Sequence, residues 1–291
     1  MAAGCGGGAA SRDAGAGGLL GCSAGTSGSV FWSGSTVWYA VGQRVLSSRG
    51  TSVSLPQGSV AVGFRACGAP AVVYSVRDQL RALSLAAGSK PQVLVDYGGN
   101  TIRPAGARAV AVRGLPSKWQ LTSVVASPRA AGAFLAAAQS PEAGIELCGK
   151  GLGAIYRVTP AGTHTLFVDN PCRDTPQPAF SPDGSRLSYL DSESNALYTL
   201  SADGTGRVRV ATRGKVISYL WSPDGRRIAY ESRVAGGASV WVSTPGGGTH
   251  RLAAGELAGW SPDGHEVALV RGRSVVAVPV AGGRSRAILH L

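Results

Sequence analysis

The sequence has no run of 18 or more apolar residues, so it offers no transmembrane helix. Stretches with the 3.6-residue period of an amphipathic helix are also few. Turn-forming residues are abundant instead, with 43 glycines and 16 prolines, and 44% of the residues are hydrophobic. These features together predict an all-β domain with many turns and enough apolar side chains for a core.

Residue groupings that carry out catalysis or bind metals are also missing. The four histidines, His164, His250, His265 and His290, lie far apart, and none has the spacing of a zinc-ligand set. Residues 21–25 match the Gly-x-Ser-x-Gly nucleophile motif, but that motif needs a strand before it and a helix after it. We therefore expect no catalytic residue, no metal site and no cofactor.

The first 29 residues lack both a basic start and the apolar segment of about 7–15 residues that marks a signal peptide. They are almost entirely glycine, alanine and serine, which predicts a flexible tether over 1–29 and one folded domain over 30–291. Ala2-Ala3-Gly4-Cys5 resembles the end of a bacterial lipoprotein signal. If the natural start lies upstream, Cys5 is the residue that would receive the lipid.

Cysteine is sparse, with five in the chain. Cys148 and Cys172 flank a glycine-rich excursion, and a disulfide between them would close a long loop. Such a bond implies an oxidising compartment, which places the protein outside the cell or in the envelope or periplasm. The alternative is a pair of free thiols in a reducing cytosol.

Acidic residues are outnumbered, 16 against 28 basic ones, and the formal net charge is +12. A basic surface can attract nucleic acid, anionic lipid or an acidic polymer. No block of five or more basic residues occurs, however, and the arginines are scattered along the chain. We expect no specific nucleic-acid binding, while an anionic polymer stays open as a partner.

Three segments of the C-terminal half align without gaps, at residues 180–189, 221–230 and 260–269. Each opens with Phe or Trp and continues Ser-Pro-Asp-Gly, and the aromatic residues are 41 and then 39 positions apart. This period is that of a four-stranded propeller blade. Proline, aspartate and glycine in this order favour a tight turn, so we assign a structural role in turns to Pro182, Asp183, Gly184, Pro223, Asp224, Gly225, Pro262, Asp263 and Gly264.

The repeated pattern is similar to the repeat of TolB-like propellers, which resemble WD-type repeats in architecture. After Ser-Pro-Asp-Gly it continues with two variable residues, an aliphatic, a small residue and an aromatic or aliphatic one. The resemblance covers residues 177–291 and implies an all-β fold, a single β-propeller. It also implies a bacterial envelope or secreted protein. The N-terminal α/β domain that TolB itself carries has no counterpart in this sequence, so the resemblance is confined to the repeats.

Upstream the pattern weakens, but apolar strand pairs continue at similar intervals, as at 71–76 with 80–88. Counting these pairs predicts six four-stranded blades, of which the first looks partial. Closure of the ring is expected to pair the two ends of the chain, which would protect the sheet edges. The predicted blades are 30–57, 58–104, 105–171, 172–214, 215–254 and 255–291.

These observations favour a non-enzymatic scaffold that binds protein partners in the cell envelope, attached to the membrane at most through a lipid, and monomeric. An enzyme of the propeller type, such as a lyase or lactonase with a metal in its channel, is one alternative. A binder of an anionic polymer is another, and strong salt dependence would mark it. Fold similarity alone decides none of these.

A binding site on a propeller is expected where loops gather at one mouth of the ring. The connections between blades, and those between the second and third strands of a blade, meet at that face. Charged residues in these connections are the candidate site: Arg173, Asp174, Asp191, Glu193, Arg213, Lys215 and Arg233.

Overall fold

The computed structural model describes most of the chain from residue 29 onward, and within this part it forms no helix that could cross a membrane. All of its regular elements are strands. The predicted tether, together with Cys5, Cys148 and Cys172, lies outside the described residues. These are 29–65, 69–86, 88–106, 108–128, 133–140, 153–159, 161–167, 178–191, 194–210, 212–234 and 237–291.

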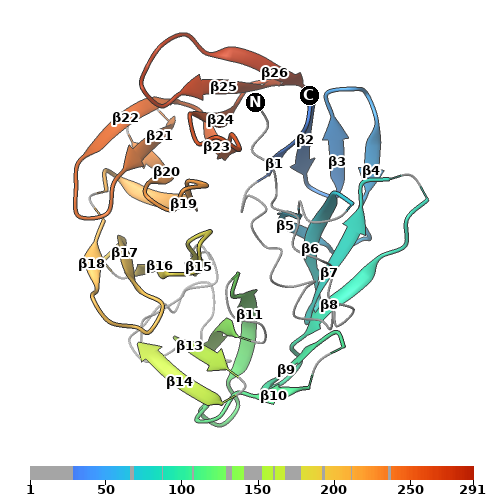
Figure 1. Ribbon diagram of the computed structural model, residues 1–291, viewed down its shortest axis with the longest axis vertical. Helices are drawn as coiled ribbons and strands as arrows, with labels where there is room; N and C mark the ends of the chain where they lie inside the picture. The colour runs from blue at the N-terminus through green and yellow to red at the C-terminus, as the bar shows by residue number, and fades with distance from the viewer. Residues whose placement is uncertain are drawn as a thin grey trace, which may run out of the picture.

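The described strands form six separate antiparallel sheets arranged in a ring, so the predicted six-bladed β-propeller is confirmed (Figure 1). Each sheet uses consecutive strands of the chain. The first sheet contains β1 (Val30–Ser33), β2 (Thr36–Val41), β3 (Arg44–Ser47) and β4 (Ser52–Ser54). The second contains β5 (Val60–Arg65), β6 (Ala71–Val76), β7 (Gln79–Ser84), β8 (Gln92–Asp96), β9 (Thr101–Pro104) and β10 (Val110–Ala111). The third contains β11 (Gln120–Ala126), β12 (Phe134–Gln139), β13 (Gly153–Thr159) and β14 (Gly162–Phe167).

The other three sheets have four strands each. They contain β15 (Ala179–Phe180), β16 (Arg186–Asp191), β17 (Ala196–Ser201) and β18 (Val208–Arg209); β19 (Lys215–Trp221), β20 (Ile228–Val234), β21 (Gly237–Ser243) and β22 (Thr249–Ala254); and β23 (Glu256–Trp260), β24 (Glu266–Arg271), β25 (Ser274–Pro279) and β26 (Arg286–His290). In Figure 1, β15, β19 and β23 lie toward the centre of the ring, and β18 and β22 lie on its periphery.

The second strand of a blade is buried on both faces, because a neighbouring blade covers each one. On β20, Ile228 and Tyr230 pack in the cluster shared with the fourth blade. Ala229 lies between them in sequence and packs in the cluster shared with the sixth blade. All three are completely buried. A continuous apolar run, rather than strict alternation, is therefore the signature of these strands.

Antiparallel strands that follow one another give the ring two distinct faces. The innermost strand of a blade begins at the face where the second strand ends, as the pairing of Lys215 with Arg233 shows. We call this the connection face, because the links between blades and the turns between second and third strands lie there. The opposite face, where Ser-Pro-Asp-Gly links the first strand to the second, is the motif face.

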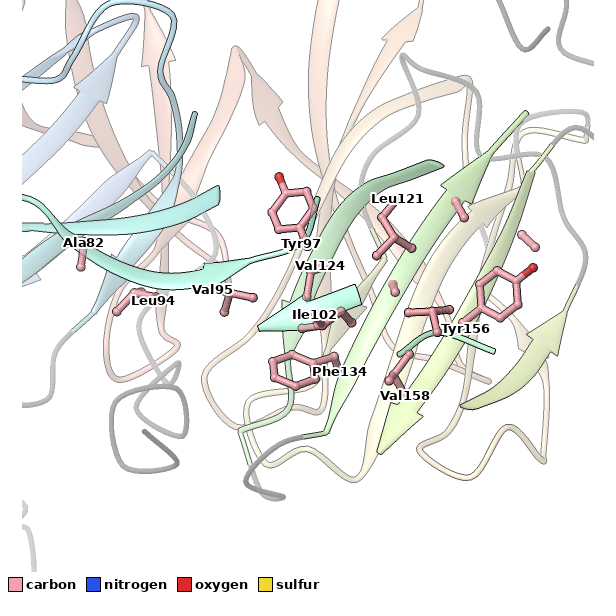
Figure 2. Close-up of a cluster of buried hydrophobic side chains, with 14 of the residues drawn as sticks. Ala82, Leu94, Val95, Tyr97, Ile102, Leu121, Val124, Phe134, Tyr156 and Val158 are labelled. Carbon is pink, nitrogen blue, oxygen red and sulfur yellow. The ribbon is translucent and has the colours of Figure 1, made fainter. Parts of the chain in front are cut away.

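The second sheet is larger than predicted. Strands β9 and β10 extend it to six strands, and Val110 pairs with Ile102. The boundary predicted at residue 104 is therefore wrong, because residues up to 111 still belong to this sheet. Ile102 is completely buried and shares a cluster with Val95 and with Phe134 of the third blade, as Figure 2 shows. The added hairpin covers apolar surface between these two blades.

For the described residues, the prediction that the two ends of the chain pair to close the ring is wrong. The first blade is complete, and in the described chain β1 pairs only with β2 and β26 only with β25. Closure comes instead from side chains, because Val30 of β1 packs in one buried cluster with Ala258 and Leu289. The Ser29 hydroxyl also donates to the Ala258 carbonyl oxygen at 3.3 Å. We call this junction of the first and sixth blades the seam.

Candidate functional site

The Ser-Pro-Asp-Gly turns of the motif face repeat one hydrogen-bonding arrangement. In the sixth blade the Ser261 hydroxyl donates to Asp263 Oδ1 at 2.6 Å and accepts the backbone N–H of Glu266 at 2.9 Å. Asp263 Oδ1 also accepts the backbone N–H of His265 at 2.9 Å, and Gly264 has a φ of 71°. Corresponding bonds hold the other two copies, among them those of Asp183 and Asp224.

These carboxylates are held by the turns that they close. The hydrogen bonds from Ser261 and from the His265 N–H keep the pKa of Asp263 below its usual value. Burial acts to raise the pKa of Asp224, but its bonds from Ser222 and the Arg226 N–H, with nearby arginines, lower it overall. A carboxylate bonded to its own turn in every copy stabilises the fold, and we place the candidate site on the other face.

Of the seven residues predicted to bind at the mouth, Arg173, Asp174 and Glu193 lie outside the described residues. The structure places the other four on the connection face: Asp191 ends β16, Arg213 and Lys215 lead into β19, and Arg233 lies near the end of β20. Asp191 accepts the Ser194 N–H at 3.3 Å and the Ser194 hydroxyl at 2.7 Å. These bonds brace the turn that follows it.

Three of these residues form what we call the cation cluster: Arg213, Lys215 and Arg233. All three side chains are exposed. Lys215 lies directly opposite Arg233 on the neighbouring strand, and Arg213 precedes Lys215 by two positions. No described residue forms an ion pair with any of them. The cluster is therefore a concentration of positive charge open to solvent.

The backbone beneath the cation cluster is fixed by side chains from two blades. Asn195, whose φ is 51°, donates from Nδ2 to the Gly214 carbonyl oxygen at 3.0 Å and accepts the Val216 N–H at 3.2 Å. The backbone N–H of Arg213 donates to the Tyr230 hydroxyl oxygen at 2.9 Å. Binding groups held on a rigid support lose little freedom when a ligand arrives.

An acidic group that sequence reasoning missed lies beside the cluster. Glu231 on β20 is half-buried, and its Oε2 accepts the Leu257 N–H of the sixth blade at 3.0 Å. Burial raises the pKa of Glu231, the Leu257 N–H lowers it, and the charge of Glu256 raises it again, while the Ser218 hydroxyl and the charge of Arg233 lower it. Burial, with Glu256 as a second cause, also raises the pKa of Tyr39 in the first blade. Charged and polar groups of three blades thus meet here.

The three repeats contained a signal for Glu231. At the position directly after the repeat, the other two copies have Leu190 and Val270, where the fifth blade has a carboxylate. Leu190 is buried, as that position requires of an ordinary blade. A charged residue at a repeat position that is otherwise aliphatic indicates a role other than core packing. No sequence signal of this kind marks Glu256 or Tyr39.

Other innermost strands also open toward solvent at the connection face. On β5, Val60 and Val62 are 63% and 44% exposed, whereas Phe64 farther along the strand is buried. On β11, Gln120 is exposed at the start, whereas Val124 is buried. This face therefore presents an apolar sector on the second blade, a neutral polar one on the third and a charged one on the fifth and sixth.

No protein-family model and no curated protein matches the sequence, but solved structures do. The likeness is one of fold. An oligogalacturonate lyase in complex with manganese matches with a TM-score of 0.54, 15% identity, 88% of this chain and 70% of its own. Regucalcin from Agrobacterium tumefaciens, a calcium-binding protein, has a TM-score of 0.51, 16% identity and coverages of 85% and 82%. A putative TolB from Agrobacterium tumefaciens has a TM-score of 0.48, 18% identity and coverages of 76% and 77%.

The neighbours with a TM-score above 0.5 thus include both a lyase and a calcium-binding protein. A propeller fold hosts many unrelated functions, so the site has to decide between them. In the part of the chain that the structure describes, no three His, Cys, Asp or Glu side chains group together as metal ligands do.

Proposed function

We propose that this propeller is a non-enzymatic binding scaffold of the cell envelope that holds a partner protein against its connection face. The cation cluster is the observation that carries the proposal. Its three exposed basic side chains have no ion-pair partner among the described residues, and the backbone below them is braced by Asn195 and Tyr230. Connections positioned by a rigid scaffold are the usual place for binding residues.

Selection of peptides tests the scaffold function. A random dodecapeptide library displayed on phage is selected on the immobilised full chain, and enriched peptides are synthesised with a fluorescent label. We expect peptides that bind saturably, with affinity measured by fluorescence anisotropy, and that crosslink to residues of the connection face. A failure to enrich any binding peptide, or crosslinks confined to the motif face, would contradict the proposal.

The envelope location rests on the predicted disulfide between Cys148 and Cys172. If the bond forms, alkylation of the unfolded chain without reductant labels three of the five cysteines, and alkylation after reduction labels all five. The matched control is Cys67→Ser, which should lower both counts by one. Labelling of all five cysteines in protein prepared from an oxidising compartment would remove this support.

An enzyme of the lyase or lactonase type is the second candidate, and Glu231 is the residue that favours it. A half-buried carboxyl whose pKa burial raises is a candidate general acid or base. The chain is incubated with oligogalacturonate and manganese, or with simple lactones, and product is measured. Turnover that Glu231→Gln abolishes would establish an enzyme and displace the scaffold proposal.

A further inference from the structure

The cation cluster breaks a rule of sheet stability. Like charges directly opposite each other on neighbouring strands destabilise the pair, and Lys215 lies opposite Arg233. No described acidic side chain forms an ion pair with either of them, and the one interaction with such a side chain is that of the Arg233 charge with Glu231, whose pKa it lowers. An anionic group bound between them would relieve the repulsion, and it would do so at a position that the backbone already holds in place.

We propose, building on the scaffold function, that the cation cluster binds the carboxylates of an acidic segment of the partner protein. Arginine suits this role because its planar guanidinium bonds a carboxylate through two parallel N–H groups. Arg213 and Arg233 supply two such groups, and Lys215, two positions after Arg213 and directly opposite Arg233, adds a compact charge. The side chains are exposed, so a protein segment reaches them without rearranging the ring.

The neighbouring carboxylates select a protein segment over a uniform polyanion. Glu231 precedes Arg233 by two positions on β20, which places both on one face of the strand at a spacing of about 7 Å. Glu256 adds a second negative charge at the start of β23. A polymer with an anion at every unit meets repulsion there. An extended peptide avoids it when a basic or neutral residue stands two positions from its acidic one.

A charge swap tests this inference with peptides selected on the wild-type chain. Lys215→Glu with Arg233→Glu reverses two cluster charges, while Lys90→Glu with Arg284→Glu makes the same charge change at exposed residues of the motif face. We expect the enriched peptides to contain Asp or Glu. Their affinity should fall at least about tenfold on the cluster variant and change less than about twofold on the control. Replacing the acidic residues of a peptide by lysine should restore its binding to the cluster variant.

Other results separate this inference from the scaffold function. Peptides that bind the wild type equally well after the cluster reversal would overturn the inference and leave the scaffold function standing. If no peptide binds the wild type, both the scaffold function and this inference are wrong. If oligogalacturonate displaces the peptides and loses affinity by the same factor on the cluster variant, the ligand is an anionic polymer and the inference is wrong. Arg213→Glu serves as an independent variant that leaves the pairing of β19 and β20 intact.

Discussion

The three C-terminal blades and the first blade share an architecture but make their first turn differently. In blades four to six the innermost strand passes to the second through Ser-Pro-Asp-Gly, with a buried serine and a bonded aspartate. In the first blade Ser33 pairs directly with Thr36, and the turn is a short exposed hairpin. After either turn, the second strand of the blade packs between two neighbouring blades. Burial of both faces of the strands therefore specifies the blade, and the motif reinforces it.

The largest difference between the two regions is expected at the aromatic residue that ends the innermost strand. Trp260 is fully buried and its Nε1 donates to the Leu220 carbonyl oxygen of the fifth blade at 3.1 Å. Trp260→Ala should lower the free energy of unfolding by about 3–5 kcal/mol. Trp32, near the corresponding end of β1, is only partly buried, so Trp32→Ala should lower the free energy of unfolding by clearly less than Trp260→Ala. Urea unfolding followed by circular dichroism measures both, and equal losses would remove the distinction.

A second variant acts where the two regions meet, at the seam. A Cβ added at Gly259 would lie 3.1 Å from the Val30 carbonyl oxygen and 3.2 Å from the Val30 Cβ. Gly259→Ala should push the first and sixth blades apart and cost about 1–3 kcal/mol. Gly248→Ala is the control, since nothing lies within 4 Å of its added Cβ. Thermal unfolding compares the two, and a neutral Gly259→Ala would show that the seam yields without cost.

The turn motif itself should contribute a smaller amount. Ser261→Ala removes a hydroxyl that bonds both Asp263 and the Glu266 N–H, and should lower the free energy of unfolding by about 1 kcal/mol. Ser35, in the exposed hairpin of the first blade, provides the comparison, and Ser35→Ala should change stability by less than about 0.5 kcal/mol. Identical effects in urea unfolding would mean that the motif adds nothing to the turn.

The smallest expected effect is a difference in pH dependence. The lowered pKa of Asp263 contributes stability that is present above the ordinary pKa of aspartate and is lost as the pH falls through the lowered value. Asp263→Asn should therefore reduce stability at pH 7 and flatten its decline toward pH 3. Glu231→Gln should have the opposite effect on the pH dependence of stability. The raised pKa of Glu231 contributes stability below the ordinary pKa of glutamate, and this contribution is lost as the pH rises through the raised value. Unfolding measured across this pH range checks both signs.

Much of the fold could be predicted from the sequence, because the repeat period and the apolar strands are local signals. The fifth and sixth blades, predicted to begin at 215 and 255, have first strands that begin at Lys215 and Glu256. The hairpin of β9 and β10 was not predicted, because no sequence motif marks where the second sheet ends. Closure was mispredicted, because a complete first blade leaves no vacant strand position, and its completeness depends on short strands such as β4.

The candidate site was less accessible to sequence reasoning. Lys215 and Arg233 are on one blade and Arg213 is in the link that leads into it, so loop position was enough to propose them. Glu231, Glu256 and Tyr39 belong to three different blades, and only the ring brings Tyr39 within reach of the Glu256 charge. Proximity of this kind depends on how the blades are packed, which no local pattern encodes.

The seam has a consequence for the gene. Since no strand is exchanged between the first and sixth blades in the described chain, the described strands of every blade come from one continuous segment of the sequence. An in-frame duplication or deletion of about 40 codons would add or remove a whole blade together with the aromatic residue that packs it. A propeller closed by a shared strand has one blade encoded at both ends of its gene, and that blade cannot be copied in a single event. Recombination can thus change the number of blades in this ring without requiring a new way of joining the first blade to the last.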